Sequence, residues 1–154
     1  MTDATGSDAA IYDALRHELI RYATALVGPD DAADLVSGAV LGALRSKGSL
    51  SALQEPKPYL MRSVLNEARM LHRSRSRRPV AALVPGSEPA IGPEHDLTVH
   101  LVMELPPQQR AATFLVYYQQ YTPTEAAALM GCRPGTVRRY LSLARTKLEE
   151  ALDE

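Results

Sequence analysis

The chain has 154 residues, of which 45% are hydrophobic, and it contains one cysteine, one phenylalanine and no tryptophan. The apolar fraction argues against wholesale disorder, and a single cysteine excludes both an intramolecular disulfide and a four-cysteine zinc site. The net charge of −1 excludes a uniformly basic or acidic protein, and no apolar stretch in the sequence is long enough for a membrane span.

The beginning of the sequence, MTDATGSDAA, is acidic and lacks the basic and apolar segments of a secretory signal. Together with the single cysteine, this predicts a cytoplasmic protein. Ala and Leu are abundant, and both lose little on entering a helix, whereas the aromatic residues that favour strands are few. We therefore expect an all-α protein.

The first two predicted helices are separated by a short break. Apolar residues recur every three or four positions between Ile11 and Leu26, which is the period of an amphipathic helix. Gly28-Pro29 ends this helix, and Asp30 or Asp31 is expected to cap the next one. The second helix should bury one stripe of apolar residues: Leu35, Val36, Val40, Ala43 and Leu44.

A third helix is predicted to begin near Pro58 and to run into five arginines between residues 69 and 78. Residues 79–93 contain four prolines and two glycines without a helical period, which is typical of a linker. We therefore expect two small helical domains, 1–78 and 95–154, joined by a linker at 79–94. The predicted buried face of the third helix consists of Met61, Val64, Leu65, Ala68 and Leu71.

The second domain is predicted to begin with two helices, near Asp96–Leu105 and from Pro106-Pro107 to about Gln120. The following segment is Thr122-Pro123-Thr124-Glu125, in which Thr122 can cap a helix and Glu125 can reach back to complete a capping box. Gly131 then ends that helix where a tight turn needs a left-handed backbone.

Ala127, Gly131 and Val137 have the spacing of a helix-turn-helix, which needs a small residue at the crossing, a glycine in the turn and an apolar wedge. The second helix of this motif is expected to begin near Pro134. Residues 126–148 contain five basic residues and no acidic one, which favours DNA binding. The competing interpretation is an ordinary helical hairpin with a solvated basic side, and it applies equally to the earlier arginine cluster.

The segment LPPQQRAATFLVYYQQYTPTEAAALMGCRPGTVRRYLSLARTKLEEAL resembles the fourth conserved region of the extracytoplasmic-function (ECF) sigma factors of bacterial RNA polymerase. The first domain resembles their second conserved region: residues 31–36 fit the start of the polymerase-contacting helix, and residues 58–66, continuing into the arginine cluster at 69–78, fit the promoter-opening helix. The matching residues of the fourth region are Leu105-Pro106, Gln109-Arg110, Ala126-Ala127, Gly131 and Gly135-Thr136-Val137-Arg138.

The resemblance implies a sigma factor that binds core RNA polymerase and promoter DNA, with no cofactor, no metal and no enzymatic activity. An anti-sigma factor is a further candidate partner. The first domain is implied to capture unpaired bases of the −10 element through Tyr59, Arg62, Asn66, Arg69 and Arg73. The second is implied to recognise the −35 duplex through Arg133, Thr136, Arg138, Arg139 and Arg145. The polymerase-binding residues implied are Asp31, Asp34, Leu35, Ser37 and Gly38.

Some interpretations stay open at this point. Tyr59 has the alternative role of a core aromatic, and Asn66 that of a solvated polar residue. After Asp-Leu-Val the family usually has Gln, an acid and then an aromatic residue, whereas this chain has Ser37, Gly38 and Val40. Loss of an acid and an aromatic anchor predicts weaker polymerase binding, by roughly a few kcal/mol.

Two other functions are compatible with the sequence. One is a helix-turn-helix regulator that binds a palindrome as a dimer without polymerase. The other is a decayed sigma-like adaptor that mainly pairs with an anti-sigma partner. The departures from the family pattern at Ser37, Gly38 and Val40 favour this second alternative.

Overall fold

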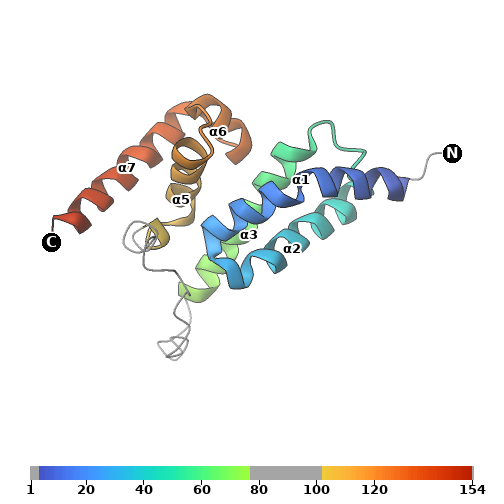
Figure 1. The fold of residues 1–154 in the computed structure, drawn as a ribbon, viewed down its shortest axis with the longest axis horizontal. Helices are drawn as coiled ribbons and strands as arrows, with labels where there is room; N and C mark the ends of the chain where they lie inside the picture. The colour runs from blue at the N-terminus through green and yellow to red at the C-terminus, as the bar shows by residue number, and fades with distance from the viewer. Residues whose placement is uncertain (1–3, 77–101, 154) are drawn as a thin grey trace.

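The structure is a computed structural model that describes residues 4–76 and 102–153, and every regular element within them is helical. This confirms the all-α fold. The first half contains α1 (Ala4–Val27), α2 (Pro29–Lys47) and α3 (Pro56–Ser76). The second half contains α5 (Pro107–Thr113), a π-helical turn η3 (Phe114–Tyr118), α6 (Pro123–Met130) and α7 (Pro134–Leu152), as Figure 1 shows. The predicted linker at 79–94 and most of the predicted helix near Asp96–Leu105 lie outside the described residues.

The break between α1 and α2 lies at the predicted place, but its cap differs from the prediction. Gly28 has φ +90° and serves as the N-cap of α2 without a side-chain hydrogen bond, and Pro29 follows as the first helical residue. Asp30 and Asp31 therefore lie in the first turn and not at the cap. Proline suits the first helical position because that N–H has no partner in any case, and this moves the cap back to Gly28. In the first turn the two carboxylates still stabilise the helix, because they lie at the positive end of its dipole.

Helices α1, α2 and α3 pack around a shared apolar core. α1 contributes Leu19, Tyr22 and Leu26, which are at most 1% exposed. Of the predicted stripes, Val40, Leu44 and Leu71 are only partly buried and Leu35 is 7% exposed. The other members are at most 1% exposed: Val36, Ala43, Met61, Val64, Leu65 and Ala68. α3 begins at Pro56, two residues earlier than predicted, because Pro58 is also tolerated within the first turn.

The helix predicted from Pro107 to about Gln120 is interrupted near its end. α5 continues into the π turn η3, in which the N–H of Gln119 donates to the carbonyl of Phe114. Gln120 then adopts a positive φ of 60°, and the N–H of Tyr121 donates to the carbonyl of Leu115. This widened turn buries Leu115 completely and delivers the chain to the start of α6.

The helix-turn-helix has the predicted caps and wedge. The Thr122 hydroxyl accepts from the N–H of Glu125 at 3.1 Å, and the Glu125 carboxylate accepts from the N–H of Thr122 at 3.0 Å, so the capping box is confirmed. These hydrogen bonds lower the pKa of Glu125. Gly131 has φ +74° in the turn, and Val137 is completely buried against Ala127 and its neighbours in the core.

The two halves of the chain pack against each other. α5 lies on α1 and α3, α6 lies on α3, and buried residues from α1 to α7 form one continuous hydrophobic cluster. In Figure 1, α7 lies on the far side of α5 and α6 from the α1–α3 bundle. The arrangement leaves one long face of α7 open, whereas α6 covers part of α3.

Replacing Thr122 by Ala should lower the free energy of unfolding by about 1 kcal/mol, because the N–H of Glu125 then loses its acceptor. Urea unfolding followed by circular dichroism measures this. Thr146→Ala is the matched control, since the Thr146 hydroxyl bonds only to the carbonyl of Ser142 on an exposed helix face. Equal losses in both variants would contradict a role for the capping box.

Candidate nucleic-acid interface

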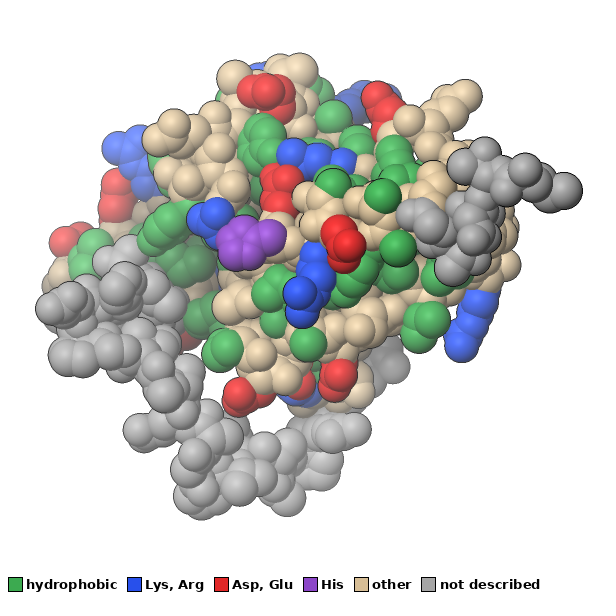
Figure 2. Space-filling view, turned by 45° about the vertical axis from the view of Figure 1, so that its right-hand side comes forward, with side chains coloured by type: hydrophobic (Ala, Val, Ile, Leu, Met, Phe, Trp, Pro, Cys, Tyr) green, Lys and Arg blue, Asp and Glu red, His purple; other side chains and the backbone are tan. Residues whose placement is uncertain are grey.

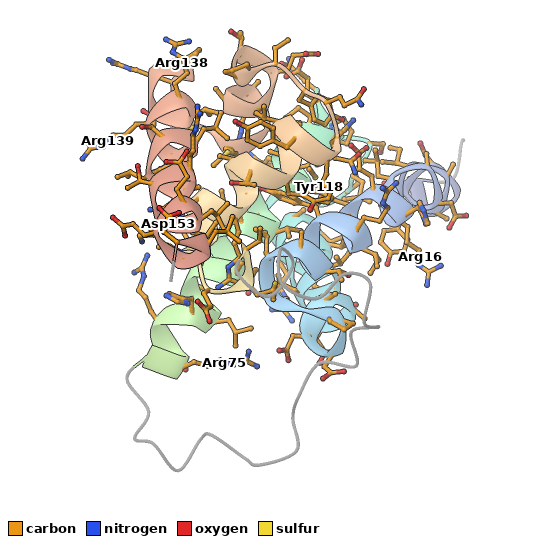
Figure 3. The ribbon with its side chains drawn as sticks, turned by 60° about the vertical axis from the view of Figure 1, so that its left-hand side comes forward. Arg16, Arg75, Tyr118, Arg138, Arg139 and Asp153 are labelled. Carbon is orange, nitrogen blue, oxygen red and sulfur yellow. The ribbon has the colours of Figure 1, made fainter. Side chains whose placement is uncertain are left out.

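The N-terminal half of α7 carries an open basic face. Arg138 and Arg139 are exposed and project away from the other helices in Figure 3. Arg133 is also exposed and occupies the N-cap without a side-chain capping bond, and Thr136 beside it is half-buried. Because Val137 and Ala144 hold the opposite face of the helix in the core, this orientation is fixed by packing. The structure therefore brings four of the five predicted −35 residues together at one end of a helix.

The fifth residue, Arg145, lies two turns further along the same helix. Its guanidinium pairs with the carboxylate of Glu149 at 3.0 Å, and both side chains are well exposed. An exposed pair of this kind contributes less than about 1 kcal/mol, so it competes weakly with any other anion. Arg145 thus extends the basic face of α7, and its weak pair with Glu149 leaves it able to bind another anion.

A second polar surface surrounds Tyr59 and Arg62 at the start of α3. These two side chains line a cavity of about 340 Å³ together with residues of the segment between α2 and α3. Tyr59 is half-buried, packs against the core on one side and hydrogen-bonds Ser46 through its hydroxyl at 3.2 Å. Tyr59 therefore packs as a core aromatic on one side and faces the cavity on the other. Its contact with DNA stays a prediction.

Sequence reasoning missed the remaining polar residues of this cavity. Lys47, Gln54 and Glu55 line it from the end of α2 and the following segment. Their segment has no periodic pattern, so no signal in the sequence relates it to α3. Only the packing of α2 against α3 brings the two together.

The other predicted −10 residues lie further along α3 and do not line this cavity. Asn66 and Arg73 are exposed, whereas Arg69 is half-buried. Arg69 lies close enough to Cys132 for its charge to favour the thiolate, although burial dominates and raises the pKa of that thiol. The Nε of Arg69 is buried and makes no hydrogen bond within the described part of the chain. Arg69 therefore faces the helix-turn-helix in this arrangement.

The predicted polymerase-binding residues divide into exposed and buried ones. Asp34 and Ser37 are exposed on α2, and Gly38 is half-buried beside the carboxylate of Glu67 from α3. Asp31 pairs with Arg75 at 2.7 Å. Leu35 is only 7% exposed and belongs to the core, so it supports the helix from within.

Three polar contacts connect the two halves of the chain. The guanidinium of Arg62 donates to the carbonyl of Ala128 in α6, from Nε at 3.2 Å and from a terminal nitrogen at 3.0 Å. The buried guanidinium of Arg110 in α5 donates to the carbonyl of Leu26 in the last turn of α1. Burial lowers the pKa of Arg110.

The third contact is a chain of charges near the start of α3. Lys57 donates to the hydroxyl of Tyr121 at 2.6 Å and pairs with Glu18 at 2.9 Å, and Tyr121 in turn donates to Glu18 at 2.6 Å. Burial alone would lower the pKa of Lys57, but the hydrogen bonds to Tyr121 and Glu18 outweigh it, so this pKa is raised. Burial and the bond to Glu18 raise the pKa of Tyr121.

Three further properties of the described residues are the distribution of charge, the capacity to hold a metal ion and the capacity to cross a membrane. On the face drawn in Figure 2, basic, acidic and apolar side chains are interspersed, with no broad area of one charge. Among the residues that the structure describes, no group of His, Cys, Asp or Glu could hold a metal ion. No helix within 4–76 or 102–153 is both long and apolar enough to cross a membrane.

Two family models match the chain in the order of its two halves. Sigma-70 region 2 matches residues 11–78, and Sigma-70 region 4 matches residues 95–148. The chain belongs to the sigma-70 family. The resemblance inferred from the sequence motifs is thereby confirmed for both regions. Helices α1–α3 are region 2, and α5–α7 with η3 are region 4.

The relatives point to the ECF group within this family. The chain is 31% identical over 127 residues to the ECF RNA polymerase sigma factor SigM of Mycobacterium tuberculosis, in each of two strains. The match covers 80% of this chain, and the chain spans 65% of the length of these relatives.

A solved structure has the same fold. It is the sigma factor RpoE in complex with the anti-sigma factor NepR from Bartonella quintana, with a TM-score of 0.66 and 23% sequence identity. The likeness covers 94% of this chain and 96% of the other.

Replacing both Arg138 and Arg139 by Ala should weaken binding to a −35 duplex by about 1–3 kcal/mol if either arginine contacts a base. Fluorescence anisotropy with a labelled duplex at moderate salt measures this. Arg16→Ala is the matched control, because Arg16 is an exposed arginine that points outward from α1 in Figure 3. Unchanged affinity of the double variant would show that neither Arg138 nor Arg139 contributes to DNA binding.

Proposed function

We propose that this chain is a sigma factor that binds core RNA polymerase in the cytoplasm and directs it to promoters. The observation that carries the proposal is the pair of separate polar surfaces, one on each region of the sigma-70 family. One is the arginine face of α7, and the other is the cavity beside Tyr59 and Arg62. A family of sigma factors is not a class of enzymes, and we assign no catalytic residue.

In the proposed function, α7 enters the major groove of the −35 element with its N-terminal half. Arg138 and Arg139 point away from the other helices in Figure 3, and an arginine can donate to both O6 and N7 of guanine at a base edge. Arg133, Thr136 and Arg145 flank them and suit contacts to phosphates, which orient the helix without reading sequence. Within residues 4–76 and 102–153, the only carboxylate paired with this basic face is that of Glu149.

Region 2 is proposed to hold the unpaired −10 strand over α3. The cavity beside Tyr59 has the volume of a small-molecule site and could receive one unstacked base, with Tyr59 for stacking and Arg62 for polar contacts. Lys47 and Gln54 at its wall supply further donors. Asn66, Arg69 and Arg73 would follow the strand along α3.

Polymerase binding is proposed for the exposed face of α2, with Asp31, Asp34, Ser37 and Gly38, supported by the buried Leu35. The family's acid is missing at Gly38, but the carboxylate of Glu67 lies 3.8 Å from the place where a β-carbon of residue 38 would be. Glu67 therefore offers an acid from the neighbouring helix at nearly the same point in space. This weakens the argument for a decayed adaptor.

An anti-sigma factor is proposed as a further partner. The structurally similar RpoE of Bartonella quintana was solved in complex with one. The surfaces that would contact polymerase and DNA are also those that such a partner would need to cover.

The test of the proposed function is run-off transcription. Purified core polymerase, with and without this chain, should produce discrete transcripts from genomic fragments only when the chain is added. Association with core polymerase is measured separately, by native gel shift across a range of salt concentrations. A chain that binds DNA but does not bind core polymerase at any salt concentration would be a free-standing regulator.

Glu67→Gln should weaken binding to core polymerase, by about 1 kcal/mol or less, and should reduce its salt dependence if this acid meets a basic surface. Competition against another sigma factor for limiting core measures the change. The matched control is Glu55→Gln, an exposed glutamate between α2 and α3. If the two variants compete equally well, Glu67 does not replace the missing acid.

A further inference from the structure

The N-terminal part of α1 is bonded to the segment that joins α2 to α3, residues 48–55. One carboxylate oxygen of Asp8 in α1 accepts from the N–H of Leu50 at 3.0 Å and from the N–H of Ser51 at 3.0 Å. In Figure 1 this end of α1 lies beside the loop between α2 and α3. A carboxylate forms stronger hydrogen bonds to backbone N–H groups than a neutral acceptor does. Asp8 therefore anchors this segment from a distant part of the chain.

The other backbone bonds of the segment are local. The Ser49 hydroxyl accepts from the N–H of Ala52 at 3.2 Å. The N–H of Leu53 donates to the carbonyl of Leu50 at 3.1 Å. Within the part of the chain that the structure describes, only the bonds to Asp8 join the backbone of this segment to a helix that it does not adjoin. Leu50 is 1% exposed, so its N–H has little access to water and would stay unsatisfied without the carboxylate.

The second half of the same segment forms a wall of the Tyr59 cavity. The residues of this wall are Ala52, Leu53, Gln54 and Glu55. Tyr59 can stack on any base, because every base has a π-face. Gln54 and Glu55 instead have amide and carboxylate groups, which can distinguish the donors and acceptors at the edges of different bases. The base selectivity of the cavity therefore depends on where the segment places these two side chains.

We infer that Asp8 is a positioning residue for base selectivity at the Tyr59 cavity. The inference rests on the proposed function. Asp8 is not among the residues that line the cavity, so it acts through the backbone: it fixes two N–H groups at one end of the segment and thereby the wall at the other end. Without this acceptor the wall can take more than one position, while α2 and α3 keep their own core contacts. A strand then still binds, but with weaker discrimination among bases.

Three variants of the full chain separate the acceptor from the charge. Asp8→Ala removes the acceptor, and alanine is the better helix former, so α1 itself is not weakened. Asp8→Asn removes the charge but keeps a side-chain oxygen that can accept both N–H groups. Asp13→Ala is the matched control, because Asp13 is an exposed acid of the same helix. Circular dichroism establishes that each variant keeps its helices.

The first readout is hydrogen exchange of the free chain, followed by mass spectrometry of a peptide that covers residues 48–55. The second is the affinity of the chain, bound to core polymerase, for fluorescein-labelled oligo(dT) in which one central base is dA, dC, dG or dT. The best and the worst base should differ by about tenfold in affinity for the parent, as one wrong base does in a protein–DNA site.

Asp8→Ala should exchange faster over residues 48–55 and should reduce the ratio between the best and the worst base by about threefold or more, which is the size of one net hydrogen bond. Asp8→Asn should keep most of the protection and most of the ratio, because its oxygen replaces the carboxylate as acceptor. Asp13→Ala should match the parent in both measurements.

Unchanged exchange in Asp8→Ala would overturn the inference, because the carboxylate would then not hold the segment. Faster exchange with an unchanged ratio would also count against it, since Asp8 would then only stabilise the segment. The same loss of ratio in Asp8→Asn would assign the effect to charge, and equal affinity of the parent for all four strands would leave no selectivity to position; each result overturns the inference. Failure of the parent to bind core polymerase overturns the proposed function, and hydrogen exchange of the free chain distinguishes that failure from the others.

Discussion

The arrangement of the two regions depends on one buried guanidinium at the end of a helix. A charge taken out of water needs partners, and Arg110 finds them in the backbone carbonyls of Leu105 and Leu26. A cation at a partly buried helix C-terminus contributes up to about 2 kcal/mol. This contact joins α5 to the end of α1, and α5 also packs on α3. α6 packs on α3 as well, where Arg62 donates to the carbonyl of Ala128.

The packing leaves one of the two proposed nucleic-acid surfaces open and places the other beside region 4. On α7, buried Val137 and Ala144 fix which face looks inward, so the arginines on the other side stay in solvent. On α3, by contrast, Arg62 and Arg69 both lie beside region 4, so these two arginines are less accessible to DNA in the proposed function. One apolar cluster, shared by both regions, holds α3 and the helix-turn-helix together.

The α2 face shows how a departure from a family pattern can be offset in space. Position 38 has no side chain, but Glu67 approaches it from α3. Leu35 follows the family pattern and is nevertheless buried in the core. A residue that matches a motif can thus lie in the core, and in the proposed function a residue outside the motif supplies the charge.

The sequence by itself determined the helical class, the break at Gly28, the capping box at Thr122, the left-handed Gly131 and the buried Val137, because each is a local pattern of few residues. It placed the cap of α2 wrongly, and it had no signal for the π turn at Phe114–Tyr118, which depends on how Leu115 packs. Only the tertiary structure decided the wall of the Tyr59 cavity, the approach of Glu67 to Gly38 and the Arg110 contact. Each of these joins residues that are far apart in the chain, where no periodicity relates one position to the other.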